Sequence, residues 1–296
     1  MNTGGRIMPA PVWDMFGDFI SPDADRAAIL EKVLNVQNIE FKTAEISGYR
    51  HFIITPPRAG QNRRRTILTA HYDRAAGSPG ANDNSAAVFI LAETAASLVK
   101  GKKDGWTIIF TDGEELSHGE GIADQGSYSL ALSLKGSEPD YARIFNFDAC
   151  GTGDTMIIST TVDYLLKNEN TAGTEKLRAA ARELRNIALE TARDLHMEKV
   201  LLAPTPFSDD AGFLMAGTAA QTITMLPSQE CALLVSSLRK DPNFTDTLVN
   251  LELRNAQNHN TIPETWRIFN SPSDSRLRLT PRSFKLVQKF AQALCG

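Results

Sequence analysis

One stretch, residues 67–98, restricts the fold of this chain more than any other. Its β-branched and apolar residues lead into His71 and Asp73, a loop rich in glycine and proline follows, and Asp83 then precedes a helix-like apolar pattern. The stretch therefore predicts a strand, an acidic loop and a helix, in that order. Open α/β sheets bind ligands beyond the carboxyl ends of such strands, so we expect these three side chains to lie in a ligand crevice.

Two further apolar strands also lead into carboxylates. Residues 106–111 run into Glu114 and Glu115, and residues 143–147 run into Asp148. One such acid alone is typical of a turn or a helix cap. Three acidic strand ends, with no lysine or arginine expected to compensate them, indicate a bound cation, and imidazole and carboxylate groups are ligands that Zn²⁺ accepts.

Strand patterns alternate with helix patterns along the rest of the chain. This alternation predicts an α/β protein of one domain, residues 1–296, with a mostly parallel, twisted central sheet and helices on both faces. Residues 1–20 are expected to form an N-terminal arm that caps the sheet, and residues from about 228 to 265 a loop and helix insertion near the active site. Further strands are expected at 49–55, 65–70, 156–160, 200–203 and 221–226, and helices at 21–37, 87–98, 125–134, 174–195, 231–240 and after Thr280.

Composition restricts the partners and the compartment. The formal net charge of -4 leaves no basic surplus for nucleic acid or anionic lipid. Cys150, Cys231 and Cys295 are widely spaced and odd in number, which predicts neither a disulfide framework nor a thiolate zinc site. The chain shows no signal-peptide pattern and no apolar stretch long enough to span a bilayer. We therefore expect a cytoplasmic protein that binds neither nucleic acid nor membrane.

The order of these motifs resembles the co-catalytic zinc aminopeptidase family, metallopeptidase family twenty-eight. The resemblance rests on H-x-D, G-A-N-D-N-S-A, E-E and a strand that ends in Asp, and on residues 207–213 followed by Gly217, which resemble S-D-x-x-x-F before a Gly. It extends from about Ile67 to the C-terminus and implies the sandwich fold of zinc exopeptidases. The family also includes glutamate carboxypeptidase, the single-zinc glutaminyl cyclases and the transferrin-receptor ectodomain, which lacks catalysis.

The resemblance implies a set of metal ligands and one or two zinc ions. His71 and Asp148 would hold one zinc, Asp83 would bridge two zincs, and Glu115 would hold the second. Two cations acidify a water and polarise a carbonyl group, which agrees with these roles.

The resemblance also implies a route for the proton. Glu114 would be the general base that takes a proton from the water as the water attacks the scissile carbonyl. Asp73 would accept the other ring N–H of His71 and fix its tautomer, since the two residues are two positions apart and share a face of the strand.

One ligand of the second zinc departs from the family pattern. The family supplies a histidine in a segment that resembles H-T-P-x-D-T, and the matching residues 269–275 have Asn270 at that position. An amide oxygen is a weaker zinc ligand than imidazole, so we expect the second site to bind metal more weakly or to prefer another metal. His259, in the polar loop before Thr261, could replace this ligand if that loop folds over the crevice, although a lone histidine in a loop is more often only solvated.

Three functions remain open from the sequence. A zinc-dependent exopeptidase, an aminopeptidase acting on short peptides or aminoacyl substrates, uses all the motifs. Asn270 favours a peptidase-fold binding protein without catalysis, whereas Glu114 argues against it. A glutaminyl-cyclase-like acyltransferase would depend on the second site and is disfavoured. The sequence leaves side-chain specificity open, and it leaves open whether the chain forms a homo-oligomer.

Overall fold

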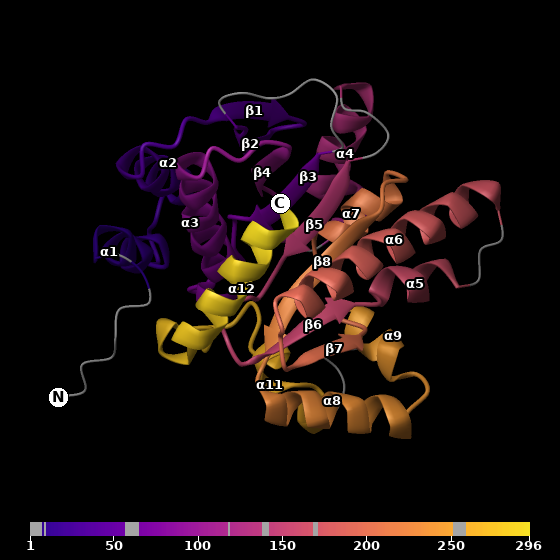
Figure 1. Ribbon diagram of the computed structural model, residues 1–296. Coiled ribbons are helices and arrows are strands. Elements are labelled where there is room, and N and C mark those ends of the chain that lie inside the picture. The colour runs from indigo at the N-terminus through magenta and orange to yellow at the C-terminus, as the bar shows by residue number, and fades with distance from the viewer. Residues whose placement is uncertain are drawn as a thin grey trace.

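The computed structural model describes residues 8, 10–56, 65–117, 119–137, 142–167, 171–250 and 259–296. At their centre lies an 8-stranded sheet with the order β1-β2-β4-β3-β5-β8-β6-β7 (Figure 1). The strands are β1 (Lys42–Ile46), β2 (Tyr49–Ile54), β3 (Thr66–His71), β4 (Trp106–Thr111), β5 (Arg143–Phe147), β6 (Thr155–Ser159), β7 (Val200–Ala203) and β8 (Ala220–Leu226). The predicted fold class, an α/β sandwich with a mostly parallel sheet, is confirmed.

The middle of the sheet is parallel and its margins are mixed. Strands β4, β3, β5 and β8 run parallel to one another, with Thr69 of β3 opposite Ile109 on one side and Asn146 on the other. Strands β1 and β2 add an antiparallel margin, and β6 is antiparallel to β8 but parallel to β7. Because β4, β3 and β5 are adjacent and parallel, the segments that follow them begin along one edge of the sheet.

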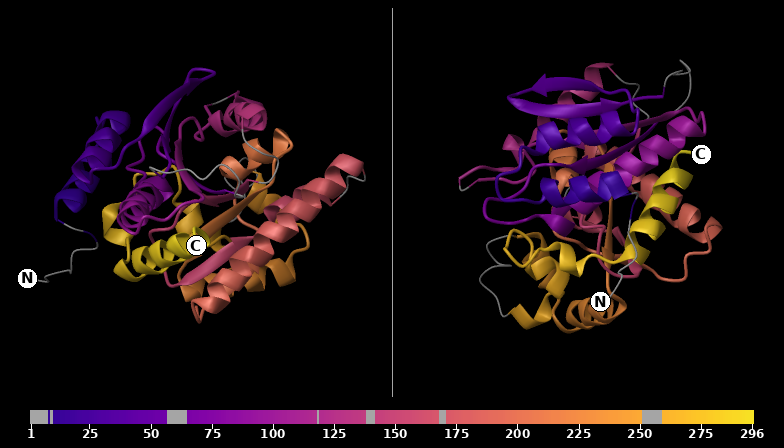
Figure 2. Two further views of the ribbon diagram at one scale, coloured as in Figure 1. Left: turned by 45° about the horizontal axis from the view of Figure 1, so that its top comes forward. Right: turned by 90° about the vertical axis from the view of Figure 1, so that its left-hand side faces the viewer.

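Helices cover both faces of the sheet (Figure 2). Helices α3, α6 and α12 pack on one face, α4 and α7 lie on the other, and α8, α9 and α11 cover the part of that second face formed by β6 and β8. The bounds of these helices, and of α5 between β6 and α6, are α3 (Ala86–Lys100), α4 (Gly126–Ser137), α5 (Thr161–Leu166), α6 (Ala172–Asp194), α7 (Asp209–Met215), α8 (Ser228–Lys240), α9 (Phe244–Val249), α11 (Glu264–Arg267) and α12 (Pro281–Leu294).

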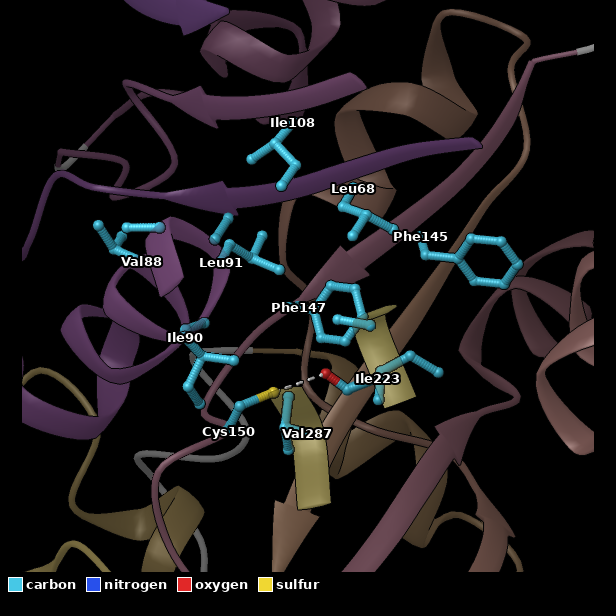
Figure 3. Close-up of a cluster of buried hydrophobic side chains, with 14 of the residues drawn as sticks. Leu68, Val88, Ile90, Leu91, Ile108, Phe145, Phe147, Cys150, Ile223 and Val287 are labelled. Atoms are coloured by element: carbon cyan, nitrogen blue, oxygen red, sulfur yellow. Dashed lines mark hydrogen bonds between the residues drawn. The ribbon is translucent and has the colours of Figure 1, made fainter. Parts of the chain in front are cut away.

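Strand side chains alternate between two apolar layers. Leu68 and Ile108 belong to the layer beneath α3 and α12, whereas Ile67 and Ile109 belong to the layer beneath α4 and α7. Figure 3 shows side chains of the first layer, from the sheet and from both helices, gathered around Phe147. Burial on both faces explains why these strands are mostly apolar and show no alternation of apolar and polar residues, as is usual in parallel sheets.

The segment that was expected to form an N-terminal arm contains a helix, α1 (Ala10–Phe19). Phe16 and Phe19 each pack edge to face on Phe89 of α3, with ring centroids 5.0 and 5.3 Å away. This end of the chain therefore contributes to the hydrophobic core, and burial of such aromatic rings is a large stabilising contribution.

The next helix begins later than its sequence predicts. We expected it to start at Ser21, but α2 (Arg26–Val36) begins five residues further on. The Asp25 carboxylate accepts the backbone N–H of Ala28 at 2.9 Å, which makes Asp25 the N-cap. Residues 21–24 form a turn instead, so the predicted start of this helix was wrong.

Residues 228–265, expected to form an insertion, contain α8 and α9, and residues 251–258 of this segment lie outside the described residues. Among the described residues, none of the helices combines the length and the apolar character needed to cross a bilayer.

Candidate active site

The predicted ligands follow three strands, β3, β4 and β5, which are neighbours in the sheet. His71 is the last residue of β3, Glu114 and Glu115 lie in the loop after β4, and Asp148 directly follows β5. Asp83 lies in the short turn η1 (Ala81–Ser85), between β3 and α3. The parallel order of these strands thus places the acidic segments at one edge of the sheet.

Three of these side chains form a buried cluster. His71 Nε2 lies 3.3 Å from Asp83 Oδ1 and 3.7 Å from Asp148 Oδ1. One ligand atom from each residue lies within 4.8 Å of the other two. The set assigned to the first zinc is therefore assembled around one imidazole nitrogen.

The two glutamates approach the same histidine. Donor atoms of His71, Glu114 and Glu115 also lie within 4.8 Å of one another. The imidazole is thus shared by two groups of donors, and the expected general base Glu114 lies next to the expected ligands of both metals.

Asp73 connects two of the segments that carry ligands. Its Oδ1 lies 3.4 Å from His71 Nδ1, on the side of the ring opposite Asp83. Its Oδ2 accepts the backbone N–H of Glu115 at 2.9 Å. One carboxylate therefore orients the imidazole and also holds the loop after β4.

The concentration of charge perturbs both glutamates. Burial, with the Glu115, Asp148 and Asp83 carboxylates, raises the pKa of Glu114 well above its ordinary value, although His71 opposes the shift. Burial and the Asp83 carboxylate likewise raise the pKa of Glu115. Negative charge is therefore costly here, and a bound cation would relieve that cost.

The histidine and its partner shift in opposite directions. Burial alone would lower the pKa of His71, but Glu114, Asp148, Asp73 and Asp83 outweigh it and raise that pKa. Burial would raise the pKa of Asp73, but its contacts with His71 and with the backbone N–H of Glu115 lower it. Asp73 is therefore favoured as a carboxylate.

The donor set fits a zinc ion. His71 Nε2, Asp148 Oδ1 and Glu115 Oε1 are buried and have no hydrogen-bond partner within the described part of the chain. Buried polar atoms normally have partners, so these atoms indicate a ligand between them. One imidazole nitrogen and several carboxylate oxygens form a donor set that zinc accepts.

The segment expected to supply the late ligand lies beside the Asp83 loop. Ser78 Oγ donates to the carbonyl of Ser271 at 3.1 Å, and Asp274 accepts backbone N–H groups of that loop. Asn270 is exposed and has a φ of 58°. Its role as a ligand stays a prediction, as does that of His259, whose side chain falls outside the described residues.

One arginine that the sequence does not reveal lies behind the site. Arg26 of α2 donates from Nη1 to the carbonyl of Asp73 at 2.6 Å and from Nη2 to the hydroxyl of Ser85. Burial lowers the pKa of this guanidinium to about 9, and the nearby Asp73 and Asp83 carboxylates oppose that shift. Arg26 thus brings a positive charge close to the acids from a helix far upstream, but its hydrogen bonds go to a backbone carbonyl and a hydroxyl rather than to a carboxylate.

A buried amide lies next to the expected general base. Gln125 Nε2 lies 3.3 Å from the Glu114 carbonyl and 3.4 Å from Glu114 Oε1. Gln125 is 3 % exposed, so water competes little for this contact. A neutral donor at this position favours the carboxylate form of Glu114 and restricts its rotation. The sequence gives no signal for this contact.

The motif of residues 207–213 adds two buried acids behind the site. Asp209 accepts a hydrogen bond from Thr111 Oγ1 at 2.5 Å, and burial raises its pKa to about 6. Asp210 accepts the Ser208 N–H at 3.1 Å, and burial raises its pKa to about 7.

Asp210→Asn is expected to stabilise the protein at high pH only. Between the ordinary pKa of 3.8 and the folded value of about 7, the folded state of Asp210 binds more protons than the unfolded state, so stability falls as pH rises. The variant lacks this loss and should exceed the parent in free energy of unfolding by on the order of a few kcal/mol at about pH 8, but not at about pH 4. Urea unfolding of metal-free protein at both pH values measures the difference. A difference that does not change with pH would contradict the assignment.

A protein-family model matches the region of the chain that carries His71, Asp83, Glu114, Glu115 and Asp148. The model described as peptidase family M28 matches residues 53–246. No curated protein sequence matches the chain.

Solved structures share the fold at low sequence identity. A zinc aminopeptidase from Bacillus subtilis is 19% identical with a TM-score of 0.52, and the alignment covers 83% of this chain and 48% of that one. This chain therefore spans about half the length of that enzyme. A Zn-dependent exopeptidase from Parabacteroides distasonis is 15% identical, TM-score 0.62, with 97% and 95% covered. A Porphyromonas gingivalis glutaminyl cyclase is 16% identical, TM-score 0.63, with 96% and 94% covered.

Proposed function

The chain belongs to peptidase family M28, and from this premise we propose that it is a zinc-dependent aminopeptidase that removes N-terminal residues from short peptides. One observation carries the proposal most: His71 Nε2, Asp83 and Asp148 converge in a buried cluster that Glu114 adjoins. Three donors and an adjacent, half-buried glutamate are the parts that metal-assisted hydrolysis of an amide requires.

The residues of the site have separate roles in this reaction. His71, Asp83 and Asp148 would hold one zinc, and Glu115 with Asp83 the second. Zinc supplies a more acidic water and a polarised scissile carbonyl when bound.

Glu114 is the group that moves the proton. It accepts a proton from the attacking water and gives it to the departing amine. Its raised pKa, caused by burial and by neighbouring carboxylates, suits a group that must take up and release a proton. Gln125 holds the Glu114 carboxylate from behind, and Asp73 holds the imidazole of His71.

Asn270 favours a second candidate, a binding protein on the same fold without catalysis. Asparagine stands where the family has a histidine, so the second metal site lacks its strongest neutral ligand. Cyclisation of N-terminal glutamine, the reaction of the glutaminyl cyclases in the family, would depend on this weakened site and is the third candidate.

The decisive experiment combines metal analysis with a substrate panel. Protein equilibrated with a slight excess of Zn²⁺ is desalted, its zinc content is measured, and the same sample is offered aminoacyl amides, their N-acetylated forms and a peptide with N-terminal glutamine. The proposal expects bound zinc, hydrolysis of the free-amine substrates only, loss of activity with chelator and recovery with zinc. Bound zinc without turnover would favour the binding protein, and cyclised product would favour the cyclase.

A further inference from the structure

The loop that carries Asp83 is held from two sides by residues outside the region that the family model matches, although Asp274 stands at the Asp of the segment that resembles H-T-P-x-D-T. The match covers residues 53–246, whereas Arg26 precedes it and Asp274 follows it. Both side chains are buried, with 6 % and 0 % of their surface exposed. Their charges are opposite, and both contact the segment between Asp73 and Ser85.

Arg26 joins the two ends of this segment. Its Nη1 donates to the carbonyl of Asp73 at 2.6 Å, and its Nη2 donates to the hydroxyl of Ser85. That hydroxyl donates in turn to the carbonyl of Gly80 at 2.5 Å. The guanidinium also lies over the ring of Phe19, 4.1 Å from its centroid, so it is fixed between α1 and the loop.

Asp274 holds the middle of the segment. Its Oδ1 accepts the N–H of Asn82 at 2.9 Å, and its Oδ2 accepts the N–H of Asp83 at 2.9 Å. Its backbone carbonyl accepts the N–H of Ala81 at 3.3 Å. The backbone of the expected bridging ligand is therefore held by a buried carboxylate from the chain's last quarter.

The same segment is attached to the strand that precedes Asp148. Asn84 Nδ2 donates to the carbonyl of Phe147 at 2.8 Å, and Asn84 Oδ1 accepts the N–H of Ala149 at 3.2 Å. These contacts relate Asp83 to Asp148, while Arg26 and Asp274 fix the segment from the other sides. The distance between the two expected ligands thus depends on all of these contacts.

We propose that Arg26 and Asp274 are positioning residues that hold residues 80–85 in the conformation that presents Asp83 before any metal binds. The consequence for zinc affinity rests on the proposed function, whereas the conformation of the metal-free loop does not. Arg26 brings a positive charge close to the site, and by charge alone it would weaken the binding of a cation. The hydrogen bonds of Arg26 favour zinc binding, whereas its charge opposes it. Replacing Arg26 should therefore weaken zinc binding if the hydrogen bonds dominate, and strengthen it if the charge dominates.

Asp274→Asn and Arg26→Gln test the two residues separately. Asparagine replaces one accepting oxygen by a donor that faces a backbone N–H, and glutamine cannot reach both acceptors of the guanidinium. We expect faster hydrogen exchange of the amides of residues 80–85 in the metal-free variants. We also expect zinc affinity, measured by competition with a chromophoric chelator, to fall by roughly 10–100-fold.

Matched variants control for the loss of a charged side chain. Asp154 also accepts a backbone N–H and a hydroxyl, both from Ser228, at 2.9 and 2.8 Å. Arg185 forms an ion pair with Asp163 on another part of the fold. Asp154→Asn and Arg185→Gln should leave the exchange of residues 80–85 and the zinc affinity unchanged. Ser85→Ala removes one acceptor of Arg26 together with the hydrogen bond from this hydroxyl to the carbonyl of Gly80. It should produce a smaller change of the same sign as Arg26→Gln, and it keeps the test available even if Arg26→Gln unfolds the protein.

The outcomes separate this proposal from the proposed function. Parent-like exchange of residues 80–85 in both Asp274→Asn and Ser85→Ala would overturn it, and so would tighter zinc binding in Arg26→Gln. If the parent protein binds no zinc but the amides of residues 80–85 still exchange faster in the variants, the positioning role would be supported and the metallopeptidase proposal refuted.

Discussion

Glu114→Gln is expected to abolish peptide hydrolysis while the protein keeps its metal. Glutamine preserves the size of the side chain and its contact with Gln125, but it cannot take a proton from water. General acid–base catalysis by a single side chain contributes roughly 10²–10⁴-fold, so kcat should fall by about that factor. Initial rates on an aminoacyl amide, with zinc content measured on the same sample, test this expectation.

Two variants separate loss of the base from loss of the metal. Glu115→Gln removes an expected ligand and should lower zinc content together with activity. Glu93→Gln changes a half-buried glutamate of α3 that lies outside both donor clusters and should change neither. A Glu114→Gln protein that hydrolysed the substrate at the parent rate would remove Glu114 from the mechanism.

The alternation of strands and helices was readable because parallel strands buried on both faces are short, apolar and bounded by polar turns. The strand 106–111 was predicted with its observed bounds. Helix starts were harder to place, because Ser21, Pro22 and Asp25 all favour a helix N-terminus and only tertiary packing selects among them. The aromatic residues of α1 likewise reveal their role only where they meet Phe89.

The grouping of the acidic residues could be predicted because adjacent parallel strands bring their ends together. The residues that support them could not be predicted in the same way. Arg26 opens a helix of ordinary amphipathic pattern, and its burial depends on where α2 docks. The resemblance assigns residues 269–275 to the second metal site, but it does not reveal that the Asp274 carboxylate accepts the backbone N–H of Asp83. Sequence patterns thus reveal ligands at strand ends, but not the contacts that hold them.

We expect the parent protein to retain about one zinc per chain after desalting and the Asn270→His variant to retain two. The segment after Asn270 contacts the loop of the expected bridging ligand Asp83 through Ser271 and Asp274. An imidazole is a stronger ligand for zinc than an amide oxygen. Asn270 has a φ of 58°, a conformation in which histidine is also enriched, and its exposed side chain leaves room for the larger ring. The substitution should therefore add a ligand without disturbing the backbone.

Asn38→His is the matched control, because Asn38 is also exposed and has a φ of 54°, but it follows the end of α2 opposite to Arg26. Elemental analysis of parent, control and variant after the same desalting gives the comparison. A second zinc in Asn270→His alone, together with a changed rate of hydrolysis, would place position 270 in the metal centre. Equal zinc in the variant and the control would mean that residues 269–275 do not correspond to the family's histidine segment, and that the second metal, if it binds, takes its last ligand from elsewhere in the chain.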